Sequence, residues 1–96
     1  MILFKIIYNM CDTQIGGTSG QRAVGLFYQH GRGGLTKDDV QALSWFMKAA
    51  NNGMGLAMHD VGFFHEYGRG GLKKNDELAL KWYRQAAEHG VSFVSL

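Results

Sequence analysis

The chain has 96 residues, a formal net charge of +2 at pH 7, and 46% hydrophobic against 19% charged residues. This balance excludes an intrinsically disordered chain, and so mild a charge gives no indication of a nucleic-acid or membrane-surface partner. The single cysteine, Cys11, excludes a disulfide within the chain and a cysteine-based zinc cluster.

The first segment, residues 1–17, opens with an apolar stretch over residues 1–12. Its apolar run is shorter than the about 20 residues that a membrane-spanning helix needs, and no small-residue cleavage site of a signal peptide follows it. We therefore expect a structural segment, and residues 1–13 are predicted to form a degenerate helix that caps the helices after it.

Residues 18–30 are predicted to form a first helix that ends at Gly31, before the glycine-rich loop Gly-Arg-Gly-Gly-Leu. A phosphate-binding loop is one interpretation of these glycines, but the preceding strand and the Gly-Lys-Ser/Thr ending of a P-loop are absent. We interpret the glycines instead as residues that supply positive φ for a tight reversal between two helices.

A second helix is predicted to start after Asp38, which forms a capping box with Gln41. Apolar residues then recur with helical spacing on one face, namely Ala42, Trp45, Phe46, Ala49 and Ala50. Gly53 is expected in the left-handed position that follows a helix C-terminus. Residues 18–53 thus form one unit of two helices, which we call unit 1.

A second unit is indicated by self-similarity at a fixed spacing. A shift of 37 aligns residues 24–59 with residues 61–96 without a gap, and 16 of the 36 pairs are identical, Trp45 and Trp82 among them. Such a period is typical of stacked supersecondary units. We predict unit 2 over residues 54–90, with a helix over residues 55–67 and another that Asn75 caps and Gly90 ends.

Two glycines fall inside the predicted first helices, where glycine costs about 0.5–1 kcal/mol relative to alanine. These are Gly25 and Gly62, which are equivalent in the two units. We expect them to let the neighbouring helix approach closely, with Trp45 or Trp82 filling the space.

The combined pattern is A-x-x-x-[LV]-G-x-[FL]-[YH]-x-x-G-R-G followed by D-x-x-x-A-L-x-W-[FY]-x-x-A-A-x-x-G. It resembles the Sel-one-like repeat (SLR) family, a helical-repeat family related to the tetratricopeptide repeats, over about residues 15–90. The resemblance implies an all-α fold, an α/α solenoid of two antiparallel helix pairs that forms a fragment of a right-handed superhelix. In that family such arrays serve as protein–protein interaction scaffolds. The loop here is one glycine longer than the family's usual loop.

The ends of the array are a second departure, because solenoids generally need about three units for stability. Residues 91–96 are predicted to be the truncated start of a third unit, and their apolar side chains would be exposed in a monomer. Either the chain forms a homo-oligomer through its exposed ends, or it is a fragment of a longer array.

Basic residues cluster along the two glycine loops. Arg32, Arg69, Lys73 and Lys74 form a predicted basic edge that could attract an acidic partner. The alternative is that nearby Asp39 and Asp76 pair with these cations.

Metal binding and catalysis are not predicted. No two of the four histidines stand at an i, i+4 spacing, so we predict no metal site and no cofactor. No serine or cysteine lies on a recognisable nucleophile elbow, so no catalytic residue is assigned. Cysteine-rich members of the family have been linked to hydrolysis of cell-wall-type substrates, but this chain lacks their paired cysteines.

The resemblance implies that the first helices line a concave groove. The candidate partner-binding residues point away from the core stripe of these helices: Arg22, Leu26, Gln29, Met58, His59, Phe63 and Glu66. Leu26 and Phe63 are equivalent apolar residues at an expected exposed position, which suits them as anchors. Met54, Leu56 and Met58 are expected to add an adaptable apolar patch.

The sequence therefore predicts a non-enzymatic scaffold that binds a protein or peptide partner in this groove, with no nucleic-acid partner and no membrane span. One alternative is an inhibitor or immunity-type protein that blocks a toxic enzyme. An alternative of another class is a hydrolase, or hydrolase subunit, acting on cell-wall-type substrates.

Overall fold

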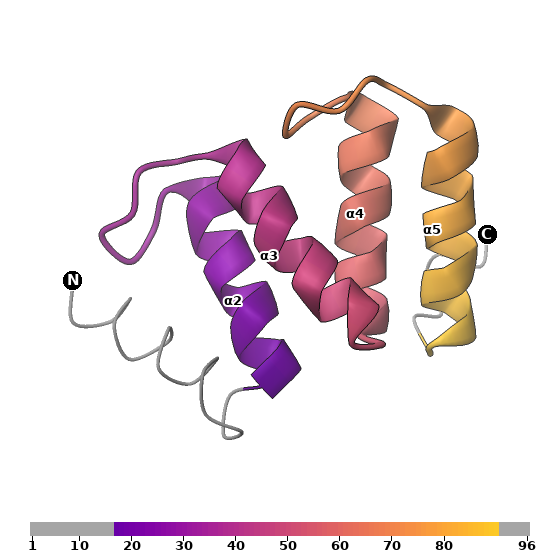
Figure 1. Ribbon diagram of the computed structural model, residues 1–96, viewed down its shortest axis with the longest axis horizontal. Coiled ribbons are helices and arrows are strands. Elements are labelled where there is room, and N and C mark those ends of the chain that lie inside the picture. The colour runs from indigo at the N-terminus through magenta and orange to yellow at the C-terminus, as the bar shows by residue number, and fades with distance from the viewer. Residues whose placement is uncertain (1–16, 91–96) are drawn as a thin grey trace.

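The computed structural model describes residues 17–90, which form four α-helices: α2 (Gly17–His30), α3 (Asp39–Asn51), α4 (Gly55–Tyr67) and α5 (Asp76–Glu88). Consecutive helices lie side by side and run in opposite directions, each contacting the next along the chain (Figure 1). The described part of the chain contains no strand. The prediction of an all-α array of two antiparallel helix pairs is confirmed. The predicted N-terminal capping helix and the start of a third unit lie outside the described residues.

Side chains cap the second helix of each unit. The Asp38 carboxylate accepts hydrogen bonds from the backbone N–H groups of Val40 at 3.0 Å and Gln41 at 3.2 Å. The prediction of a complete capping box was wrong, because the Asp38 N–H donates to the Tyr28 carbonyl at 2.9 Å. That bond ties the start of α3 to the end of α2.

The two glycine-rich loops have the same backbone conformation. Gly31, Gly33 and Gly34 have φ values of 66°, 65° and 84°, and their equivalents in unit 2 have 63°, 68° and 86°. Glycine adopts this left-handed region without the steric cost that other residues incur. The loops are therefore helix-to-helix reversals, and the additional glycine contributes one more left-handed residue to each.

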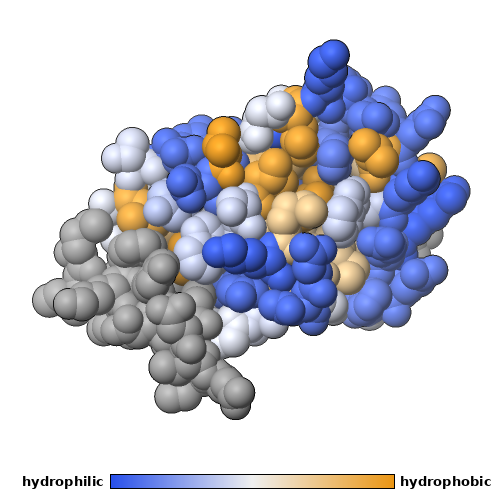
Figure 2. All heavy atoms as spheres, in the orientation of Figure 1, coloured by the Kyte–Doolittle hydropathy of each residue, from blue (hydrophilic) through white to orange (hydrophobic). Residues whose placement is uncertain are grey.

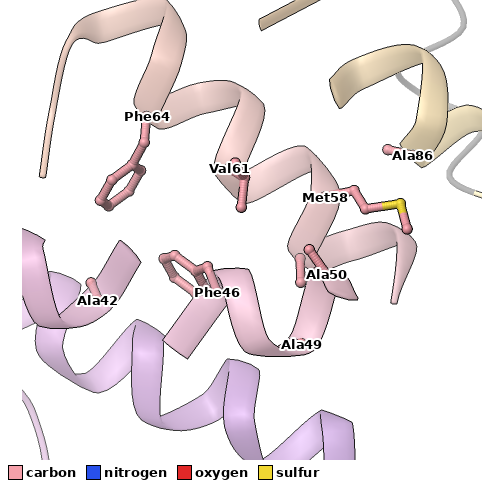
Figure 3. Close-up of a cluster of buried hydrophobic side chains, with 9 residues drawn as sticks. Ala42, Phe46, Ala49, Ala50, Met58, Val61, Phe64 and Ala86 are labelled. Carbon is pink, nitrogen blue, oxygen red and sulfur yellow. The ribbon is translucent and has the colours of Figure 1, made fainter. Parts of the chain in front are cut away.

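The core lies where α3 meets α4 (Figure 3). Phe46 and Phe64 are both fully buried, and their rings meet edge to face with centroids 5.6 Å apart. The same buried cluster contains five small side chains, which let the helices approach closely: Ala42, Ala49, Ala50, Ala57 and Ala86. This alternation of large and small residues gives a tightly packed interior.

The gaps left by the mid-helix glycines are filled by residues other than the predicted tryptophans. A Cβ on Gly25 would lie 2.7 Å from the Phe46 ring, and a Cβ on Gly62 would lie 2.7 Å from the Tyr83 ring. Trp45 and Trp82 are half-buried instead. The prediction was wrong because residues 45 and 46 both belong to the apolar stripe, and packing decides which of them points at the partner helix.

Candidate interaction surface

Exposed hydrophobic side chains are spread over several helices of the array. On the face shown in Figure 2, hydrophobic side chains gather over the middle of the molecule, and hydrophilic ones cover much of the edge that α5 forms. The large hydrophobic residues that are exposed in the described chain are Val40, Leu56, Tyr67, Leu78 and Leu80.

The predicted anchors, Leu26 on α2 and Phe63 on α4, are both partly buried and pack against the core. Phe63 lies beside Tyr67, one helical turn further on, with ring centroids 4.6 Å apart. The Tyr67 side of this pair faces solvent, since Tyr67 is 58% exposed. The Arg69 guanidinium lies 5.6 Å from the centroid of the Phe63 ring. We call Phe63 and Tyr67 the aromatic patch.

Arg22 forms an ion pair that connects α2 with α4. Its Nε donates to Asp60 Oδ2 at 2.7 Å, and the two side chains are only 24% and 14% exposed. Burial raises the pKa of Asp60 above its ordinary value of 3.8, although Arg22 and His59 act in the opposite direction. Arg22 thus fixes one first helix against the other.

His59 and Glu66 lie on the side of α4 that faces α5. The Tyr83 hydroxyl donates to Glu66 Oε1 at 2.5 Å, and the Tyr83 and His59 ring centroids are 5.1 Å apart. Burial and the Glu66 carboxylate raise the pKa of Tyr83, so its hydroxyl stays protonated and able to donate. No pattern in the sequence indicated this contact of Tyr83 with Glu66.

Met58 is a core residue rather than a surface residue. It is 6% exposed and lies in the buried cluster with Ala86 of α5 (Figure 3). The expectation that it helps form an exposed apolar patch was therefore wrong, because this side of α4 is covered by α5. Leu56 is 39% exposed, Met54 is partly buried against the core, and Gln29 is half-buried.

The predicted basic edge is partly neutralised within the chain. Arg69 makes two hydrogen bonds to Asp39, from Nε at 3.0 Å and from Nη2 at 2.8 Å. These bonds, with the charges of Arg69 and Lys37, lower the pKa of Asp39. Lys74 pairs with Asp76 at 2.8 Å, while Arg32 and Lys73 are exposed. Pairing with the two aspartates, the alternative raised from the sequence, is confirmed for Arg69 and Lys74.

Among residues 17–90, no group of three or more histidine, cysteine, aspartate or glutamate side chains is arranged so that it could hold a metal ion. A pocket of about 250 Å³ lies between α4 and α5, lined by Glu66, Asp76, Ala79, Leu80 and Tyr83. Neither His59 nor His65 lines it, and Cys11 lies outside the described residues.

The family model for the Sel1 repeat matches residues 18–54 and again residues 55–91. The chain belongs to the Sel1 repeat family. It has the helical scaffold fold of that family, and the resemblance to the Sel-one-like repeats inferred from the sequence is confirmed.

Three solved structures of bacterial Sel1-type proteins superpose on the chain. A Sel1 repeat protein from Oxalobacter formigenes shares 30% identity with a TM-score of 0.82, over 94% of this chain and 37% of its own. The protein c5321, a protective antigen of uropathogenic Escherichia coli strains with an SLR fold, shares 33% identity with a TM-score of 0.76, over 84% of this chain and 17% of its own. Cysteine-rich protein B of Helicobacter pylori shares 25% identity with a TM-score of 0.83, over 96% of this chain and 66% of its own.

This chain therefore spans about a third of the Oxalobacter protein and a smaller share of the Escherichia coli protein. No curated protein matches the sequence. None of the helices among the described residues is long and apolar enough to cross a membrane.

Proposed function

We propose that this Sel1 repeat chain is a non-catalytic scaffold that binds a protein or peptide across its first helices, α2 and α4, with Leu26 and Phe63 as anchors. The observation that carries this proposal is the aromatic patch. In this patch two aromatic rings contact each other at a tilt: Phe63 packs on the core, and Tyr67 faces solvent. Partly exposed aromatic residues that are already fixed in place are typical centres of binding energy in interfaces.

The surroundings of the aromatic patch are preorganised. Phe63 contacts Phe64 with ring centroids 6.2 Å apart, and Arg69 is held by its two bonds to Asp39. A partner that docks there would not have to order these side chains, so less of its binding free energy is lost to entropy. The Arg22–Asp60 pair supports the same surface by joining α2 to α4.

The chemistry of the surface favours a partner with an apolar side chain that covers Phe63 and Tyr67, and with polar groups at its rim. Arginine and tyrosine beside a half-buried aromatic ring resemble the composition of interface centres. No contact among the described residues favours the inhibitor-type function or the hydrolase function over this one.

The test is a pull-down from cell extract with the wild-type chain and a Leu26→Ala/Phe63→Ala double variant, followed by titration of each purified partner. We expect the double variant to lose partners that the wild type retains, with at least about a tenfold loss of affinity for two interface anchors. Circular dichroism must show that the variant remains folded, since both side chains also contact the core.

A Val40→Ala variant is the matched control, because Val40 is 61% exposed on α3 and lies outside the proposed surface. It should retain all partners. If the folded double variant recovers the same partners with the same affinity, binding across α2 and α4 is refuted.

A further inference from the structure

We propose that the outer face of α5 is a second docking site, which binds a helical segment of a protein partner that carries an aromatic side chain and an arginine at the spacing of Phe64 and Arg69. This face is separate from the aromatic patch. The proposal rests on the comparison of two equivalent surfaces within the chain, one covered and one open.

In unit 1 the covered surface lies on α3. The Phe64 ring of α4 packs edge to face on Phe46, and Arg69 forms its two hydrogen bonds to Asp39. The backbone at Gly70 lies so close that a Cβ there would be 3.0 Å from the Asp39 carbonyl oxygen and 3.1 Å from the Leu43 Cβ. Unit 2 therefore docks on unit 1 with an aromatic ring, an arginine and a close backbone contact.

The equivalent surface of unit 2 lies on α5. A shift of 37 residues carries Asp39, Leu43 and Phe46 onto Asp76, Leu80 and Tyr83. Leu80 is 48% exposed and the Asp76 side chain is 75% exposed, whereas the Asp39 side chain is 28% exposed under Arg69. The pocket of about 250 Å³ is lined by these three residues together with Glu66 and Ala79. It occupies the place that Arg69 and Gly70 fill in unit 1.

The charge of this pocket favours an arginine. Glu66 and Asp76 put two carboxylates at an apolar floor of Ala79, Leu80 and the Tyr83 ring. In unit 1 the position of Glu66 is held by the neutral Gln29, so the open pocket is more acidic than its covered counterpart. An arginine can place its methylene stem on the apolar floor and its planar guanidinium against a carboxylate.

Within the described chain, Lys74 takes the position beside Asp76 that an incoming arginine would need. Both members of this pair are mostly exposed, and such surface pairs contribute little to stability. An arginine that makes two parallel hydrogen bonds can therefore replace the lysine at small cost.

The probe is a synthetic peptide of residues 55–74 of this chain, which contains both Phe64 and Arg69. It is titrated into the full, nitrogen-15-labelled chain and followed by NMR. We expect resonances of Leu80, Tyr83 and their neighbours to shift. Asp76→Arg in the protein should weaken binding about tenfold, as expected for loss of one bidentate pair. A peptide with Arg69→Asp should restore binding to that variant.

The matched control is Glu77→Arg, which makes the same charge change in the first turn of α5 at a residue that does not line the pocket. It should bind the peptide like the wild type. The Leu26→Ala/Phe63→Ala protein should also bind it unchanged, so failure of this site and failure of the first site can be told apart.

Three results would overturn the proposal. The first is an absence of shifts at millimolar peptide. The second is a set of shifts at Leu43 and Phe46 instead, because the peptide would then be displacing α4 from unit 1. The third concerns the protein without peptide: the Leu80 and Tyr83 resonances shift as the protein concentration rises, and Arg32→Asp abolishes these shifts. The occupant of the face would then be a second copy of the chain.

Discussion

Replacing Phe46 with alanine tests whether α4 closes the core, and Tyr83→Ala at the equivalent position of unit 2 is the matched comparison. Phe46 is 0% exposed and packs on Phe64 from the next unit. Tyr83 is half-buried, because no described helix lies beyond α5. The same repeat position therefore has two different environments in one chain.

The magnitude follows from this burial. Truncating a buried phenylalanine to alanine costs about 3–5 kcal/mol, of which the edge-to-face contact contributes ~0.5–1.5 kcal/mol. For a chain of 96 residues a typical free energy of unfolding is roughly 5–14 kcal/mol. Phe46→Ala should therefore remove a large fraction of the stability. For Tyr83→Ala we expect a smaller loss, since the Tyr83 side chain is only partly buried and part of its apolar surface is already in water.

The assay is urea unfolding followed by far-UV circular dichroism and tryptophan fluorescence, with the slope of the transition checked for two-state behaviour. Equal losses for the two variants would refute the reasoning, because they would mean either that α4 does not seal Phe46 or that the outer face of α5 is covered in solution.

Three further predictions concern packing and charge. Gly25→Ala should destabilise the chain by about 1–2 kcal/mol in thermal unfolding, because the clash with Phe46 outweighs the gain in helix propensity; a stabilised variant would contradict the packing. A double-mutant cycle with Arg69→Met and Asp39→Asn should give a coupling of about 1 kcal/mol that falls with added salt, and a zero coupling would show that the pair is not formed in solution. NMR titration should place the pKa of Asp39 below 3.8 and that of Asp60 above it, since hydrogen bonds from Arg69 favour ionised Asp39 and burial disfavours ionised Asp60. Ionised Asp39 therefore stabilises the fold above pH 3.8, and this stabilisation is lost as the pH falls through the pKa of Asp39 in the folded chain. Ionised Asp60 instead destabilises the fold, and this cost disappears when acid protonates its carboxylate. The opposite order of the two pKa values would refute this account.

The fold was predictable because its determinants are local and occur twice. The 37-residue spacing, the caps at Asp38 and Asn75, and the glycines of the loops each specify a helix end or a reversal. The rotation of each helix about its axis was not predictable to better than one residue. The placement of Phe46, and not Trp45, in the Gly25 gap depends on packing between helices, which periodicity does not contain.

The candidate surface was predictable only in part. The equivalence of Leu26 and Phe63 is visible in the sequence, and both are partly buried in the structure. The pairing of Arg22 with Asp60 depends on the offset between successive units, and no sequence pattern of a two-unit chain fixes that offset. Met58 was misplaced because its burial depends on how α5 packs against α4 within unit 2, which the periodicity of α4 alone does not show.

The order of the helices has a consequence for how the chain folds. Each helix contacts chiefly its neighbours in sequence, so loop closure is short and either helix pair can form first. Arrays of this kind behave as a row of coupled units, whose cooperativity depends on the coupling between neighbours. That coupling passes through the Arg22–Asp60 pair and through the joint where Phe64 meets Phe46 and Arg69 meets Asp39. Weakening this joint should therefore do more than lower the midpoint of unfolding: it should split one transition into two.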